Sequence, residues 1–251
     1  MSETPSLSGK VAMITGASTG IGKASAVALA KLGVKVALAA RSEDALQKAV
    51  EEITSQGGTA IGVKTDVTKR DQVKALAAET ESKLGPVDIV VNSAGIWYYT
   101  LMTNLKEDAW EEMIDINCKG VLNSIGAVLD SMVKRKTGHI INISSDSGRR
   151  PFEGIAVYGG TKYFVEGMTA SMRREVAQHG IRMTNVQPGD VVTLGALKAP
   201  IDTAAAELYD KSTEVQVLDA EDVARAVVYA ASQPSHVAVN EVLVQPLLRP
   251  V

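Results

Sequence analysis

Short apolar runs alternate with longer amphipathic stretches along nearly all of the 251 residues. The runs are rich in β-branched residues and too short for helices, so they predict strands. Apolar residues at helical spacing fill the intervals. Strand–helix alternation builds parallel βαβ units with helices on both faces of one sheet, so the sequence predicts a doubly wound α/β fold. The predicted strands are 10–15, 34–39, 59–64, 88–91, 139–143, 182–186 and 241–244, all expected to be buried, and the predicted helices are 21–32, 42–55, 69–83, 106–134, 157–178 and 220–231.

The composition shows no break that would divide the chain, so residues 1–251 are expected to form a single dinucleotide-binding and catalytic domain. The stretch 193–213 fits the alternation worst and contains a short helical pattern over 202–210. In an open α/β sheet, an insertion after a strand lies over the ligand crevice. We therefore expect a short helical lid there.

The bulk composition excludes several classes of function. A formal net charge of −3 without a clustered basic surplus argues against a nucleic-acid partner. The apolar runs are too short to span a bilayer, which argues against a membrane protein. One cysteine and three widely spaced histidines make a metal site improbable. With no disulfide and no secretory signal, we expect a cytoplasmic protein.

A glycine-rich loop, residues 15–22, joins the first predicted strand to the first predicted helix. Glycines let a pyrophosphate approach the backbone, and a helix N-terminus offers free N–H donors. The spacing has one residue more than the usual G-x-G-x-x-G pattern. A nucleotide-binding loop is the favoured interpretation, and a tight structural turn is the alternative.

Two further strand ends bear on the cofactor. The second strand ends at Arg41-Ser42, where NAD-specific sites carry an acid. A guanidinium suits a ribose 2′-phosphate, so Arg41 predicts NADP(H), unless it is an ordinary surface charge. Asp66, followed by Val67, ends the third strand; it is either an acceptor for the adenine amino group or a helix N-cap, a role that Thr68 fits equally well.

Tyr158 and Lys162 are four residues apart in a predicted helix, so their side chains share one face. A nearby ammonium lowers the pKa of a phenol, which predicts a general acid or base near neutral pH. Ser145 follows the 139–143 strand, at the sheet edge where ligands bind. Asn117 lies within a predicted helix, where asparagine is unfavourable, and is either functional or simply solvent-facing or locally hydrogen-bonded.

Together these segments resemble the short-chain dehydrogenase/reductase family, from residue 10 to about 246. Residues 15–22 look like its T-G-x-x-x-G-x-G loop, and 92–95 look like its N-N-A-G turn with Ser93 in place of the second asparagine. Ser145, Tyr158 and Lys162 match its catalytic serine and Y-x-x-x-K motif.

The resemblance implies a Rossmann-type fold and an NADP(H)-dependent oxidoreductase acting on a small or medium carbonyl or alcohol. Tyr158 would be the acid/base, Ser145 would orient the carbonyl, Lys162 would bind the nicotinamide ribose and lower the pKa of Tyr158, and Asn117 would support a water chain. The implied cofactor residues are Gly16, Ser18, Thr19, Gly20, Ile21, Gly22, Arg41, Ser42, Asp66, Val67, Asn92, Ala94, Gly95, Tyr158, Lys162, Pro188, Gly189, Val191 and Thr193.

A catalytically silent NADP(H)-binding sensor or scaffold of the same fold is the alternative function. The family also implies a homodimer or homotetramer, paired through the helices predicted over 106–134 and 157–178. Residues 97–99, Trp-Tyr-Tyr, either wall the substrate pocket or pack on the long helix. Arg149 and Arg150 either anchor a substrate carboxylate or, as favoured here, face solvent or another subunit.

Overall fold

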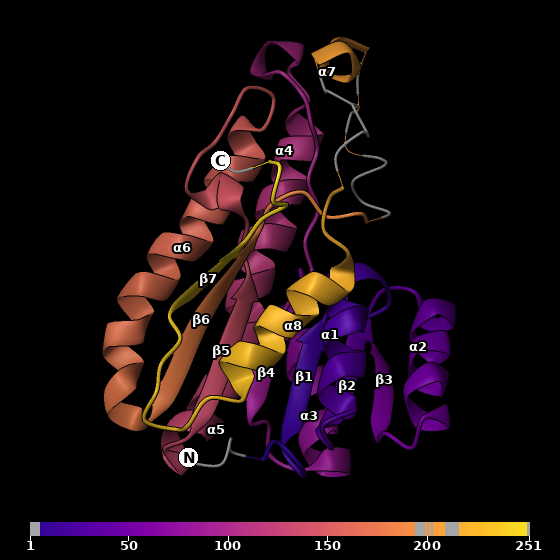
Figure 1. Ribbon diagram of the computed structural model, residues 1–251, viewed down its shortest axis with the longest axis vertical. Coiled ribbons are helices and arrows are strands. Elements are labelled where there is room, and N and C mark those ends of the chain that lie inside the picture. Colours follow the sequence, from indigo (N-terminus) through magenta and orange to yellow (C-terminus); the bar gives the residue numbers. More distant parts are fainter. Residues whose placement is uncertain (1–5, 194–198, 200, 202, 209–215, 250–251) are drawn as a thin grey trace.

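A seven-stranded, entirely parallel sheet forms the centre of the protein, in the strand order β3-β2-β1-β4-β5-β6-β7. The computed structural model describes residues 6–193, 199, 201, 203–208 and 216–249. The predicted doubly wound α/β fold is confirmed, and Figure 1 shows the sheet with helices on both faces. The strands are β1 (Val11–Thr15), β2 (Lys35–Ala40), β3 (Ala60–Lys64), β4 (Ile89–Asn92), β5 (Gly138–Ile143), β6 (Ile181–Pro188) and β7 (Glu241–Val244). The α-helices are α1 (Gly20–Ala30), α2 (Glu43–Ser55), α3 (Arg70–Leu84), α4 (Glu107–Ile114), α5 (Gly120–Arg135), α6 (Ala156–Val176), α7 (Thr203–Leu208) and α8 (Ala220–Ala231).

Two apolar layers hold the sheet between its helices. On one face, α1, α2 and α8 pack on side chains such as Ile14, Leu38 and Ile141. On the other face, α3, α5 and α6 pack on Met13 and Ile140, among others. Successive residues of a strand point to opposite faces, so the fully buried strands are apolar throughout.

The expectation that every strand is buried is wrong for β3 and β7. Residues of β3 are half-buried or exposed, and those of β7 alternate between the two classes. Both are edge strands with a single neighbour. The burial of a strand depends on its position in the sheet, which a local pattern does not encode. The sequences of these edge strands therefore could not be distinguished from those of central strands.

Most of the predicted lid, residues 193–213, lies outside the described residues. Within it, α7 (Thr203–Leu208) lies inside the short helical pattern predicted over 202–210. Figure 1 shows α7 beyond the end of the sheet, well apart from the strands. That this stretch closes over a ligand stays a prediction.

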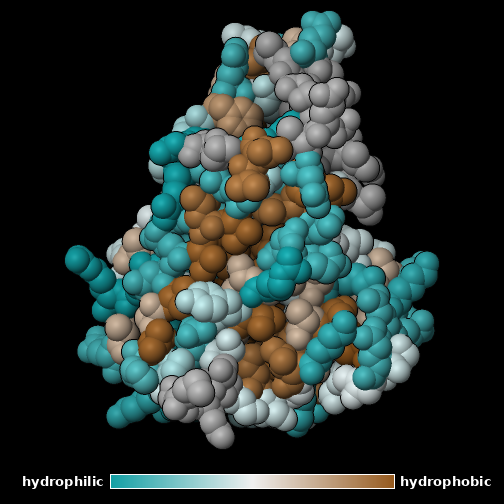
Figure 2. Space-filling view, in the orientation of Figure 1, coloured by the Kyte–Doolittle hydropathy of each residue, from teal (hydrophilic) through white to brown (hydrophobic). Residues whose placement is uncertain are grey.

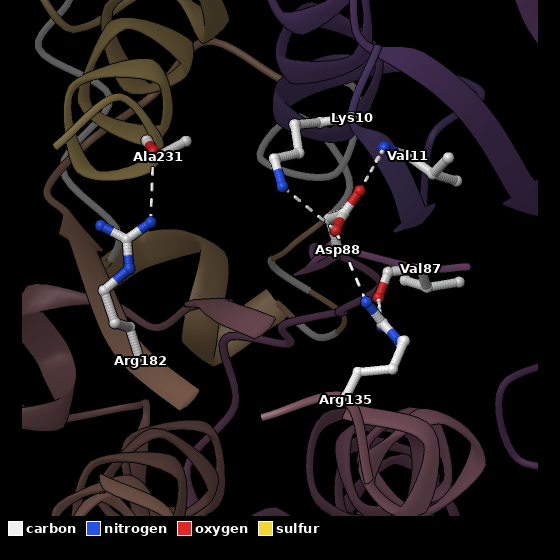
Figure 3. A network of polar contacts seen from close by, with 7 residues as sticks. All are labelled: Lys10, Val11, Val87, Asp88, Arg135, Arg182 and Ala231. Atoms are coloured by element: carbon white, nitrogen blue, oxygen red, sulfur yellow. Dashed lines mark hydrogen bonds and ion pairs between the residues drawn. The ribbon is translucent and has the colours of Figure 1, made fainter. Parts of the chain in front are cut away.

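Charged side chains secure the end of the sheet opposite to the glycine loop (Figure 3). The Asp88 carboxylate accepts the backbone N–H of Val11 at 3.0 Å and pairs with Lys10 at 3.4 Å and Arg135 at 3.6 Å. These contacts join the first residue of β1, the residue before β4 and the end of α5. Arg182 of β6 donates to carbonyls that follow or end α8, including Ala231 and Gln233.

His139 is a buried neutral residue next to Arg182 in the sheet register. Its Nε2 lies 2.8 Å from the Thr184 hydroxyl, which donates to the Val239 carbonyl at 2.6 Å. The hydroxyl proton is therefore already used, so Nε2 must carry the imidazole proton. Burial and, secondarily, the charge of Arg182 lower the pKa of His139 to about 3.

This buried imidazole makes acid stability testable. The unfolded chain binds a proton at His139 below its ordinary pKa of 6.5 and the folded chain does not until about 3, so stability falls as the pH drops below 6.5. We expect about 1.4 kcal/mol of unfolding free energy to be lost per pH unit. Urea unfolding between pH 7 and 5 should show a weaker pH dependence in His139→Gln. The exposed His236→Gln is the matched control and should behave as wild type; equal slopes in all three proteins would contradict this account.

The surface that Figure 2 shows has apolar side chains gathered between α6 and α8, over β6 and β7. Val239, Val242 and Val244 are partly buried against the core there. In the described part of the chain, no helix is both long and apolar enough to cross a membrane.

Candidate active site

The glycine loop lies where β1 meets β4. Gly16 has φ +64°, and a Cβ on it would lie 2.7 Å from the backbone N of Ala94. Gly22 similarly leaves no room for a side chain against the carbonyl of Gly16. Thr15 accepts the N–H of Ala94 through its hydroxyl at 3.2 Å. The loop thus brings the start of α1, with its unpaired N–H groups, beside the turn after β4.

The predicted cofactor residues gather at the carboxyl edge of the sheet, because parallel strands all end there. Thr193 lies near the loop, with its methyl 3.7 Å from the position of a Cβ on Gly20. Val191 bridges to Leu218, ahead of α8. The remaining ones follow their strands directly: Arg41 and Ser42 after β2, Asp66 and Val67 after β3, Ala94 and Gly95 after β4, and Gly189 after β6, whose last residue is Pro188.

Asp66 is not a helix N-cap. Its Oδ1 accepts both the backbone N–H and the hydroxyl of Thr68, at 2.9 and 2.8 Å, which closes an Asx turn, while Lys69 occupies the N-cap position of α3. Burial opposes ionisation, but the hydrogen bonds from Thr68 and the charges of Arg41 and Lys69 together hold the pKa of Asp66 below its ordinary value. Ser42 is the N-cap of α2, and its hydroxyl accepts from the backbone N–H of Ala45 at 3.4 Å.

Asn117 lies in a π-helical turn, Asp115–Lys119, that interrupts the predicted 106–134 helix between α4 and α5. It is buried, so the solvent-facing alternative is wrong. Its amide pairs twice with the backbone of Ile96, at 2.9 and 2.8 Å, and Nδ2 also donates to the hydroxyl of Thr161 at 3.1 Å. Single π-turns are common at functional sites. Here the turn aims Asn117 at the loop after β4.

Tyr158 and Lys162 occupy successive turns of α6. The Lys162 ammonium lies 5.6 Å from the centroid of the Tyr158 ring and donates to the carbonyl of Ile143 at 2.9 Å. A Cβ on Gly95 would lie 3.8 Å from that ammonium and 3.3 Å from Asn117 Oδ1. The structure therefore brings Lys162, Asn117 and the turn after β4 together.

The expected lowering of the phenol pKa by Lys162 is wrong in this structure. Burial raises the pKa of Tyr158 to about 12; the hydrogen bond with Ser145 opposes this rise and the charge of Asp146 adds to it. Burial lowers the pKa of Lys162 to about 8, against the opposite influence of Cys118 and Glu166. The ammonium donates to the backbone carbonyl of Ile143, and the shift in the pKa of Tyr158 follows from burial, Ser145 and Asp146.

A row of buried amides lies beneath α6, and the sequence analysis missed it. Asn92, Asn142 and Asn185 stand side by side on β4, β5 and β6. Asn92 donates to Asn142 at 2.8 Å, Asn142 donates to Thr169 of α6 at 2.9 Å, and Asn185 donates to Glu166 of α6 at 2.7 Å. The row ties the helix that carries Tyr158 to three strands. Asn92, one of the predicted cofactor residues, is buried and donates from its side chain within this row.

Of the two interpretations of residues 97–99, packing on the long helix is confirmed for Tyr98, and a substrate-pocket wall stays a prediction. The Tyr98 hydroxyl donates to Glu112 of α4 at 2.7 Å, so it packs on the long helix. The ring of Trp97 lies 5.9 Å from that of Tyr158, and both pack against the apolar cluster that contains Tyr99. Arg149 pairs with Glu241 of β7.

Comparison with known proteins identifies the family of this chain. A family model described as short chain dehydrogenase matches residues 10–204. A glycine betaine reductase of Emericella nidulans is 46% identical over 245 residues, which are 98% of this chain but 19% of that protein. An uncharacterized oxidoreductase of Listeria monocytogenes is 44% identical over 250 residues, covering 96% of this chain and 98% of its own length.

Solved structures agree. A serine dehydrogenase in its closed form with NADP+ is 30% identical with a TM-score of 0.87, and 96% of each chain is covered. An alcohol dehydrogenase from Thermococcus sibiricus, complexed with 5-hydroxy-NADP, is 30% identical with a TM-score of 0.85, over 96% of this chain and 98% of the other. The fold is that of oxidoreductases of the short-chain dehydrogenase type. The chain belongs to the short-chain dehydrogenase family.

Proposed function

We propose that this protein is an NADP(H)-dependent oxidoreductase that interconverts a small or medium carbonyl compound and its alcohol, with Tyr158 as general acid and base. The observation that carries the proposal is the placement of the Lys162 ammonium 5.6 Å from the centroid of the Tyr158 ring, one helical turn away on α6. Ser145 follows β5 at the carboxyl edge of the sheet and opposes the rise in the pKa of Tyr158. A proton donor and a second hydroxyl at one point suit a carbonyl oxygen, which accepts two hydrogen bonds.

The residues present fit a nicotinamide dinucleotide. Gly16 and Gly22 keep the loop free of Cβ atoms where a pyrophosphate would approach, and α1 begins beside it. Asp66 is an ionised acceptor at the position expected for adenine. Two solved relatives hold NADP+ or a modified NADP, which supports the choice of cofactor.

In the reduction direction, the carbonyl carbon receives the hydride that the nicotinamide supplies when bound. Ser145 holds the carbonyl oxygen, and Tyr158 gives its phenolic proton to that oxygen, so an alcohol forms. With a pKa raised to about 12, Tyr158 is a protonated donor throughout the neutral range. Asn117 and Lys162 would return the proton from solvent, since both border the turn at Gly95.

Arg41→Asp tests the cofactor preference. Replacing a guanidinium that faces a 2′-phosphate with a carboxylate removes an ion pair and adds repulsion, so we expect NADPH to bind about 100-fold more weakly. The affinity for NADH, which lacks that phosphate, should change little. Fluorescence titration measures both constants. The exposed Lys48→Asp on α2 makes the same change of charge as the control, and equal weakening of NADPH and NADH by Arg41→Asp would refute the assignment.

Turnover tests the function itself. Oxidation of NADPH and NADH is followed with a panel of aldehydes, ketones and keto acids. Reduction with NADPH supports the proposal. Tight NADPH binding without reduction of any member would favour the alternative, a catalytically silent sensor or scaffold. The relatives named for glycine betaine, serine and alcohols make small polar carbonyls the first to try.

We expect the protein to form a homodimer or homotetramer. Leu122 of α5 and Tyr163 and Phe164 of α6 are exposed hydrophobic residues on the helices predicted to pair. Exposed apolar side chains on adjoining helices favour contact with a second copy. A monomer by light scattering at micromolar concentration would contradict this expectation.

A further inference from the structure

An additional carboxylate, that of Asp146, lies beside the two proposed catalytic hydroxyls. Its Oδ1 accepts from the Ser145 hydroxyl at 3.2 Å, and its Oδ2 accepts from the Gln245 amide at 3.1 Å. A Cβ on Gly189 would lie 3.1 Å from Oδ2, so this side chain also reaches the turn after β6. Its charge is among the influences that raise the pKa of Tyr158. Asp146 is thus close to the point where a substrate carbonyl would sit.

A negative charge at this point is unfavourable for an uncharged substrate. Reduction builds negative charge on the carbonyl oxygen, which a neighbouring carboxylate repels. The carboxylate also makes the Tyr158 phenol a weaker acid. In the described part of the chain, its side-chain partners are the neutral groups of Ser145 and Gln245. An asparagine could accept from Ser145 through Oδ1 and, with the Gln245 amide turned over, donate from Nδ2 to the Gln245 oxygen, so the structure alone does not require the charge.

A positive charge on the substrate would reverse this cost. A cation within two or three bonds of the carbonyl carbon would lie near Asp146, offset its charge and stabilise the developing alkoxide. The existing cations nearby are engaged elsewhere, since Lys162 binds the carbonyl of Ile143 and Arg149 pairs with Glu241.

The apolar side of the site indicates which kind of cation fits. The ring of Trp97 lies 5.9 Å from that of Tyr158 at an angle of 47°. Both rings pack on an apolar cluster of Tyr99, Ile155 and Ala199. Aromatic faces attract cations within about 6 Å, indole most strongly. An apolar wall of this kind suits N-methyl groups better than a hydrated ammonium, so a quaternary ammonium is favoured.

We propose that Trp97 and Asp146 form a subsite for a quaternary ammonium group, and that the substrate is a small aldehyde with a trimethylammonium group next to the carbonyl. The proposal rests on the proposed reductase function. Trp97 contacts the methyl groups and Asp146 balances the charge. Neither residue moves a proton; both determine specificity.

The test compares two aldehydes of the same shape. Trimethylammonioacetaldehyde carries the cation, and 3,3-dimethylbutanal has carbon in place of the nitrogen. The readout is the ratio of their kcat/KM values with NADPH. Each KM is expressed as the concentration of the unhydrated aldehyde. A general injury to catalysis lowers both rates and leaves the ratio unchanged. We expect a ratio of about 100 in wild type, falling about tenfold in both Asp146→Asn and Trp97→Leu.

Glu153→Gln is the control variant. Glu153 is an exposed carboxylate whose charge reaches Tyr99 of the same apolar cluster. Solvent screens such a charge, so its removal should leave the ratio at the wild-type value. A fall in this control as large as that in Asp146→Asn would mean that overall charge sets the ratio, which overturns the subsite.

The remaining outcomes separate the two proposals. A wild-type ratio near one, or a high ratio that neither Asp146→Asn nor Trp97→Leu changes, overturns the subsite while the reductase function stands. Reduction of other carbonyls but of neither aldehyde does the same. If no carbonyl is reduced although NADPH binds, the reductase function fails and the subsite fails with it.

Discussion

Tyr158→Phe is expected to reduce turnover at least 10³-fold while leaving NADPH affinity within about twofold of wild type. The substitution removes the phenol oxygen proposed to give a proton to the carbonyl, and it keeps the ring that packs beside Trp97. Loss of a positioned general acid has an effect of this size, whereas the apolar contacts of the ring are preserved. Single-turnover reduction and fluorescence titration of NADPH measure the two quantities separately.

The pH dependence gives the same prediction a second readout. Because the pKa of Tyr158 is raised to about 12, the phenol stays protonated as the pH rises through neutral, and reduction keeps its acid. Oxidation of the alcohol needs the phenolate, so its rate should rise about tenfold per pH unit below that pKa. Residual reduction above a tenth of wild type in Tyr158→Phe would exclude Tyr158 as the acid. An oxidation rate that is flat above pH 7 would contradict the raised pKa.

Gly16→Ala is expected to destabilise the fold by about 3 kcal/mol or more and to abolish NADPH binding. A residue with a side chain at φ +64° is strained by about 1–2 kcal/mol. The new Cβ would also lie 2.7 Å from the Cα and N of Ala94, and backbone atoms cannot move aside. Forcing β1 and β4 apart adds an overpacking cost of about 1–3 kcal/mol. It also opens the loop beside α1.

Gly57→Ala is the matched control for this prediction. Gly57 has φ +82°, and nothing lies within 4 Å of the position of its Cβ. It therefore has the conformational strain without the clash, and should cost about 1 kcal/mol with unchanged NADPH affinity. Urea unfolding measures both variants. Equal costs would mean that the approach of Gly16 to Ala94 has no energetic importance.

Local patterns predicted the architecture well because each element carries its own signal. The α8 helix and the β7 strand have the bounds that the sequence suggested. Acidic residues mark the start of the helix, and the apolar run of the strand is followed by Gln245 and a proline. The same patterns failed where burial depends on neighbours. The edge positions of β3 and β7 follow from the strand order, which no single run of residues encodes.

The positions of the candidate site residues in the fold were predictable, and their contacts were not. The spacing of Tyr158 and Lys162 indicated a shared helix face, but the phenol pKa depends on burial and on Asp146, a neighbour that only the fold reveals. The unfavourable position of Asn117 in a helix was a usable signal, although the π-turn that resolves it was not foreseen. Glu166 and Asn185 gave no signal, because their partners are distant in sequence.

The row of buried asparagines beneath α6 also specifies how the strands align. The strand neighbours of these asparagines, Val91, Ile141 and Val186, face the opposite, apolar layer. A slip of one residue in any of these strands would turn an amide into that layer and separate it from its partners. Each buried amide left without a hydrogen bond costs about 1–3 kcal/mol. The asparagines therefore stabilise one register of the central strands relative to registers shifted by one residue.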